Sequence, residues 1–137
     1  MSQAGNSNPA LVTEDSELLA HYLCYTEEAL AELTSTLQNP GNPADQAAAL
    51  HATAHNIKGM GTSFGFPLMT EVGTLLCGYL RGLAENAPLD RELIADHLTA
   101  MNVIIENRIT GDGGDTGSEL IRRLQERIDL VESSKTS

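Results

Sequence analysis

A histidine and a lysine three residues apart, His55 and Lys58, are the side chains whose types and spacing suggest chemistry. A neutral imidazole keeps a lone pair on one ring nitrogen, and a lysine one turn away can neutralise an anion held there. Lys58 is the only lysine or arginine in the first 80 residues. Gly59 is about 1 kcal/mol worse than alanine inside a helix, yet it leaves the space beside the imidazole empty. A solvated surface histidine is the ordinary alternative, but this setting indicates a ring that a large molecule must approach.

A helix from Pro43 to Phe64 would separate these residues from an apolar face. At about 100° per residue, the apolar side gathers Leu50, Ile57, Met60, Gly61 and Phe64. The other side, within about 60° of His55, gathers Ala48, His51, Ala52, Lys58, Gly59 and Thr62. His55 is therefore predicted to point toward water.

The spacing H-x-x-K-G-x-x-x-x-x-G resembles the signature of histidine-containing phosphotransfer (HPt) domains. The residues that carry it are His55, Lys58, Gly59 and Gly65, with apolar Ile57 and Phe64 and a helix restart at Pro67. The motif-level match covers about residues 45 to 80, and the helical pattern of the whole chain agrees more loosely.

The resemblance implies that His55 accepts a phosphoryl group, through Nε2, from an aspartate of a receiver domain and hands it to another receiver. It implies that Lys58 stabilises the charge and that Gly59 clears the docking surface, for which Ala48, His51, Ala52 and Thr62 are further candidates. Response-regulator receivers are the expected partners, with the receiver of a hybrid histidine kinase as one candidate. Mg²⁺ is expected on the receiver, so no cofactor or metal is assigned to this chain.

The rest of the sequence has helical periodicity and no alternating β pattern. Helices are predicted from Thr13 or Asp15, from Asn42, from Phe66 and from about Asp90, followed by an amphipathic helix over residues 118–132. The expected organisation is a flexible N-terminus (1–12), a bundle (13–110), a Gly/Asp linker (111–117) and a C-terminal helix and tail (118–137). Short loops and one apolar stripe per helix favour an all-α, up-down antiparallel four-helix bundle, with the last helix as a fifth member or a dimer contact.

Length and charge exclude several classes of function. A chain of 137 residues holds one ordinary domain, which leaves no room for the ATP-binding domain of a histidine kinase. A net charge of −11 and an aromatic content of 4% argue against nucleic acids and anionic membranes as partners. Without a signal-like N-terminus or a membrane-length apolar run, the expected location is cytoplasmic.

Other side chains that could do chemistry lack the partners they need. His51 and His55 have the spacing of two zinc ligands, but Ala52 replaces the glutamate that a metalloprotease helix requires. His21 and His97 are predicted to be structural. Cys24 and Cys77 lack the spacing of a metal site and are predicted to be reduced and half-buried. The loop residues Asp112 and Asp115 lack the ligand pattern of an EF-hand.

Two further functions stay open. The chain could be an interaction module that docks receiver or kinase domains without carrying phosphate, or a structural bundle that dimerises through residues 118–132. An autophosphorylating kinase helix is disfavoured, because Asn56 follows His55 where that class has an acidic residue, and because no Gly-rich nucleotide loop is present. A monomer is the expected state.

Overall fold

The computed structural model describes residues 9–39, 41–83 and 87–136, and every regular element in these ranges is helical. The elements are α1 (Pro9–Gln38), α2 (Pro43–Gly61), a 3₁₀ turn η1 (Thr62–Phe64), α3 (Pro67–Arg81), α4 (Arg91–Glu106) and α5 (Gly114–Thr136). The prediction of an all-α fold is confirmed. Among the described helices, none combines the length and the apolar character needed to cross a bilayer.

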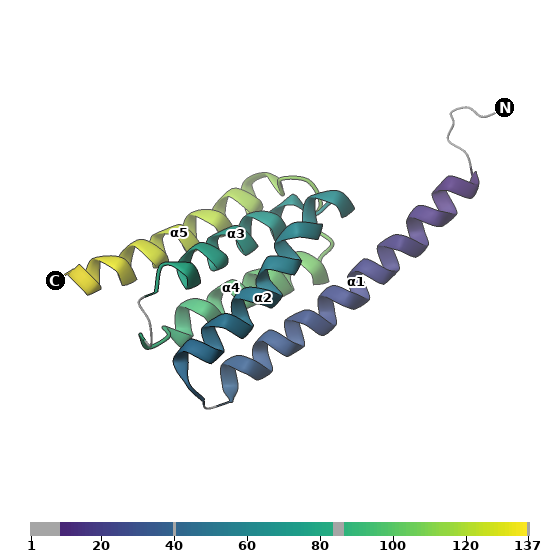
Figure 1. Cartoon of the computed structure of the whole chain (residues 1–137). Helices are drawn as coiled ribbons and strands as arrows, with labels where there is room; N and C mark the ends of the chain where they lie inside the picture. Colours follow the sequence, from purple (N-terminus) through teal and green to yellow (C-terminus); the bar gives the residue numbers. More distant parts are fainter. Residues whose placement is uncertain (1–8, 40, 84–86, 137) are drawn as a thin grey trace.

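Successive helices run in opposite directions and pack side by side (Figure 1). Contacts join α1 to α2, α2 to α3, α3 to α4 and α4 back to α1, while α5 packs on α3 and α4. The contact between α2 and α3 is the most extensive. The N-terminal turns of α1 project beyond the other helices (Figure 1).

The apolar stripes of the helices meet in one core. The largest side chains with essentially no exposure are Phe66, Leu33, Leu50, Ile57, Leu68, Met69, Leu76, Leu93, Ile94, Met101, Ile104 and Ile105. Burying one such side chain stabilises the fold by about 1.5–3 kcal/mol, which explains why each helix turns this stripe inward. On α1, the Tyr22 ring stacks on Phe64 and Phe66 with centroid separations of 4.6 and 5.6 Å, which fixes α1 against the turn after α2.

Local sequence signals set the ends of the helices that carry the site. Asn42 accepts hydrogen bonds from the Ala44 and Asp45 amides at 2.8 and 3.3 Å, so it caps α2 as predicted. α2 ends at Gly61 and continues as the 3₁₀ turn, not as α-helix, to Phe64. Gly65 stops it with φ of 90°, a left-handed conformation that suits glycine.

Three predictions about the ends of the chain and its cysteines are wrong. α1 already includes residues 9–12, so neither Thr13 nor Asp15 caps it; residues 1–8 of the predicted flexible segment lie outside the described residues. α5 begins at Gly114, within the predicted linker, and the Asp112 carboxylate just before it accepts a hydrogen bond from the Gly114 amide at 2.9 Å. Neither thiol is half-buried: both are free, but Cys24 is exposed and Cys77 is buried.

His97 is a structural residue of α4. It is fully buried, and its Nδ1 lies 2.8 Å from the Leu93 carbonyl oxygen, to which the Nδ1–H donates. Burial, opposed by that hydrogen bond and by Asp96, lowers the pKa of His97. His21, by contrast, is exposed on α1.

Candidate functional site

Two glycines let the backbones of α2 and α3 touch. A Cβ added to Gly73 would lie 2.9 Å from Lys58 Cβ and 3.1 Å from Lys58 Cα. A Cβ added to Gly61 would lie 2.7 Å from the Phe66 carbonyl oxygen and 2.9 Å from the Thr70 amide nitrogen. All four distances are shorter than ordinary van der Waals contacts of a Cβ atom, so only glycine fits at either position without separating the helices. The contacts also define an antiparallel register in which Gly61 faces Thr70 and Lys58 faces Gly73.

The hydroxyl of Thr70 fastens this hairpin. It donates to the Lys58 carbonyl oxygen at 2.9 Å and accepts a hydrogen bond from the Thr62 amide at 3.0 Å. These bonds satisfy backbone groups that the change from α-helix to 3₁₀ turn leaves without helical partners. The last turn of α2 is thereby attached to the first turns of α3.

We expect Gly73→Ala to destabilise the protein by about 1–3 kcal/mol, because the added methyl group forces α3 away from Lys58. The matched control is Gly78→Ala on the same helix, where nothing lies within 4 Å of the added Cβ. That change should stabilise by about 0.5–1 kcal/mol through helix propensity. Denaturant unfolding measures both free energies, and an equal gain for the two variants would contradict the close contact at Gly73.

His55 lies exposed on α2, away from the core. Beside it, nothing lies within 4 Å of a Cβ added to Gly59. Ala48, Ala52 and Thr62 are exposed as well, whereas His51 is half-buried. The predicted docking residues therefore share one side of α2, and their roles in docking stay predictions.

Lys58 is half-buried, although the sequence places it on the exposed side of the helix. Its Cα and Cβ face the glycine of α3 at position 73, so α3 covers the root of the side chain. Lysine keeps its charged end in water while its methylene groups pack, so the ammonium can still serve the His55 face. No ion pair or side-chain hydrogen bond of Lys58 is seen among the described residues.

An arginine that sequence reasoning missed joins this face from α3. Arg81 is exposed at the last residue of the helix, and its charge acts on both His51 and Cys77. The antiparallel register explains this placement. Arg81 lies about two turns after Gly73 on α3, and His51 lies about two turns before Lys58 on α2. Because Gly73 faces Lys58, Arg81 lies near His51. Arg81 is the first basic residue after Lys58 in the sequence, which could have marked it as a candidate. Its place near the histidines, however, depends on how α2 pairs with α3.

The sequence profile of the Hpt domain family matches residues 17–133. The chain belongs to the Hpt domain family. Hpt domains have a phosphotransfer role in His-Asp phosphorelays, act as carriers rather than kinases, and interact with response-regulator receiver domains. Among curated proteins and solved structures, none matches this chain at a significant level. The matched range runs from α1 into α5, so it includes the C-terminal helix as well as the α2–α3 hairpin.

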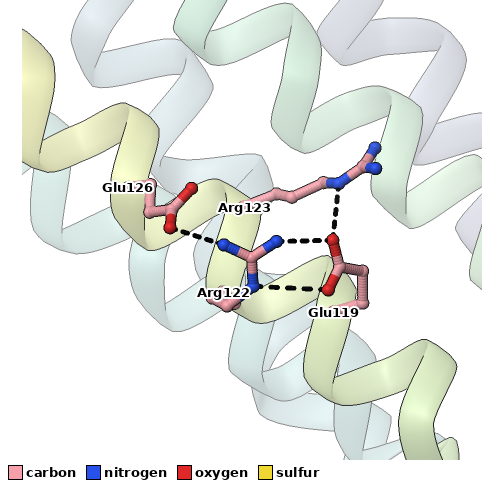
Figure 2. Close-up of polar contacts among 4 residues, drawn as sticks. All are labelled: Glu119, Arg122, Arg123 and Glu126. Carbon is pink, nitrogen blue, oxygen red and sulfur yellow. Dashed lines mark hydrogen bonds and ion pairs between the residues drawn. The ribbon is translucent and has the colours of Figure 1, made fainter.

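The charges of this Hpt domain divide into a paired and an unpaired set. On α5, Arg122 pairs with Glu119 and Glu126, and Arg123 pairs with Glu119 (Figure 2). Arg127 pairs with Glu92 and Asp96 of α4. Such exposed pairs add little stability, but they neutralise the three arginines of α5.

The unpaired set among the described residues is Lys58, Arg81, Arg91 and Arg108, and the first two lie near His51 and His55. Within the described ranges, Lys58 and Arg81 make no ion pair, while Arg91 and Arg108 donate to the carbonyl oxygens of Leu37 and Ile105. In a chain of net charge −11, Lys58 close to the exposed His55 and Arg81 close to the neighbouring His51 create a local site for an anion. The same ranges contain no cluster of three histidine, cysteine, aspartate or glutamate side chains able to hold a metal ion.

Proposed function

We propose that this Hpt domain is a phosphorelay carrier in which His55 accepts a phosphoryl group from a receiver aspartate and passes it to another receiver. The observation that carries the proposal is the exposed imidazole on α2, with open space at Gly59 on one flank and an unpaired Lys58 on the other. Family membership supports the reaction class. The proposal assigns the chain no kinase activity.

In the forward step, the lone pair of His55 Nε2 attacks phosphorus and forms the P–N bond. The P–O bond to the receiver aspartate breaks, and its electron pair leaves on the carboxylate. Negative charge spreads over three phosphoryl oxygens in the loose transition state, so a protein contributes mainly positioning and positive charge. Lys58 supplies the charge from α2, and Mg²⁺ is expected on the receiver.

The shape of the surface supports docking of a folded partner. Near-attack geometry brings the reacting atoms within about 3–3.5 Å, so the receiver must approach α2 closely. The exposed neighbours of His55 on that side are small: Ala48, Ala52, Gly59 and Thr62. Because Gly61, Gly73 and Thr70 hold α2 against α3, the imidazole stands on a rigid support.

The test is transfer from a purified, phosphorylated receiver to the full chain. We expect an acid-labile, base-stable label that mass spectrometry of the intact protein and its peptides assigns to His55. Addition of a second, unphosphorylated receiver should then remove the label. A chain that binds receivers but never acquires the label would be a docking module, the second function considered above. A cytoplasmic location and a monomeric state stay predictions.

We expect Lys58→Ala to slow transfer by about tenfold or more, the scale of a lost charged contact of about 1.5–3 kcal/mol. The free energy of unfolding should change by less than about 1 kcal/mol, because alanine retains the Cβ that faces Gly73. Arg123→Ala on α5 is the control, since it removes one positive charge on a different face. Rapid-quench measurements give the rates, and equal rates for the two variants would argue against a role for Lys58.

A further inference from the structure

His51 lies one helical turn before His55, with its ring almost parallel to the second imidazole. The ring centroids are 6.1 Å apart and the planes are inclined by 12°. His51 is half-buried, and its Nε2 is enclosed without a hydrogen-bond partner in the described part of the chain. Enclosed polar atoms without partners are uncommon, and each one calls for an explanation.

The charged groups around His51 are all positive or neutral. On its own helix these are His55 and Lys58, and on α3 it is Arg81. On α1, Glu32 accepts a hydrogen bond from Thr53, which lies about 200° around α2 from His51. Partial burial, followed by the charges of Arg81, His55 and Lys58, holds the pKa of His51 below its ordinary value. The ring is therefore neutral in the free protein near pH 7.

We propose that phosphorylation of His55 is coupled to proton uptake by His51, which then donates a hydrogen bond to the phosphoryl group. The coupling rests on the proposed function of His55. A phosphoryl group one turn away provides the acceptor that the enclosed nitrogen lacks. Rotation about χ2 can turn either ring nitrogen toward it, because this torsion is broad and close to two-fold. The proton comes from solvent, and no bond other than the P–N bond at His55 is formed.

The electrostatic reason is the loss of net positive charge around the ring. Before transfer, His51 faces two uncompensated cations; afterwards, a phosphoryl group of about −2 charge offsets them. At separations near 6 Å on a partly exposed surface, this change should raise the proton affinity of His51 by about tenfold. By linkage, protonated His51 should hold the phosphoryl group on His55 about tenfold more favourably than neutral His51 does.

The direction of the pH effect follows from the two protonation states. The phosphorylated form binds more protons than the free form, in the pH range between the lowered pKa of His51 in the free chain and its higher value after loading. Acidification through that range should retain the phosphoryl group on this chain, and alkalinisation should favour its return to a receiver. The phosphoryl oxygens themselves titrate near pH 6 and also make the partition depend on pH. The contribution of His51 is therefore the difference in pH dependence between the wild type and a variant that lacks His51.

The experiment loads the full chain with phosphoramidate, a small donor whose P–N bond breaks with loss of ammonia as the new P–N bond forms. Mass spectrometry confirms loading at His55. NMR then follows the His51 imidazole from about pH 4.5 to 8.5 in the free chain and from about pH 6 to 8.5 in the loaded chain, because the P–N bond at His55 is acid-labile. We expect about a tenfold rise in its proton affinity after loading. The exposed His21 on α1 should titrate unchanged in the same sample, and His55→Glu should shift His51 in the same direction without any phosphoryl group.

A second arm measures how the phosphoryl group partitions between this chain and a receiver over the same pH range. His51→Gln should still load at His55, but the roughly tenfold change with pH in the partition of the phosphoryl group should be lost. Loading that leaves the His51 titration unmoved would overturn the coupling while the carrier function stands. A chain that takes no phosphoryl group on His55 from a receiver or from phosphoramidate would contradict both.

Discussion

Replacing His55 by glutamine should abolish phosphoryl transfer to this chain. Glutamine retains a polar side chain on the exposed side of α2, but its amide nitrogen has no lone pair available to attack phosphorus. Because the imidazole is exposed and outside the core, the free energy of unfolding should change by no more than about 0.5 kcal/mol. Labelling from a phosphorylated receiver, followed on the intact protein, should therefore fall to background in a folded variant.

The controls for this variant are the exposed His21 and the half-buried His51. His21→Gln on α1 should label like the wild type, and in His51→Gln any label that forms should still be found at His55. Circular dichroism and denaturant unfolding establish that each variant is folded. If His55→Gln still acquires the label, another residue is the phosphoryl acceptor, and the proposed function of His55 is contradicted.

Gly59→Leu should slow transfer by about a hundredfold while leaving the free protein at least as stable. Nothing lies within 4 Å of a Cβ added at this position, so leucine meets no steric barrier within the chain and has better helix propensity. In the docked complex the same side chain would stand beside the imidazole. A displacement of the receiver by even about 1 Å costs on the order of a hundredfold in rate, because the reacting atoms no longer reach near-attack distance.

Gly59→Ala separates stability from docking. It should stabilise α2 by about 0.5–1 kcal/mol and slow transfer less than leucine does, because only a methyl group enters the interface. Rates at saturating and limiting receiver concentration distinguish weaker docking from a misplaced phosphorus atom. Normal transfer by Gly59→Leu would show that the space at Gly59 is incidental and would remove the main geometric support for docking over His55.

Features written in neighbouring residues could be predicted from the sequence. The step of three and four between apolar residues gave the inward faces of α3 and α4, including Val72, Leu76, Ile94 and Met101. Asn42 was recognisable as a cap, since its side chain needs only the amides two and three residues later. The exposure of His55 followed from the same periodicity.

Features that depend on residues distant in sequence could not be predicted in this way. The covered root of Lys58 and the place of Arg81 beside His51 both depend on the register between α2 and α3. The sequence shows a glycine at position 73, but the residue of α2 that it contacts is known only from the structure. The buried state of Cys77 likewise depends on the neighbouring helix, since thiols occur in both settings.

The close contact of α2 with α3 also limits how phosphorylation can be communicated. Sliding one helix along the other would bring side chains of one against the backbone of the other at Gly61 and Gly73, and would break both hydrogen bonds of Thr70. The hairpin therefore has no low-energy shear motion by which a modified His55 could reshape the fold. A receiver would then distinguish the loaded from the empty carrier by the change in charge on its surface and not by a change in the packing of these two helices.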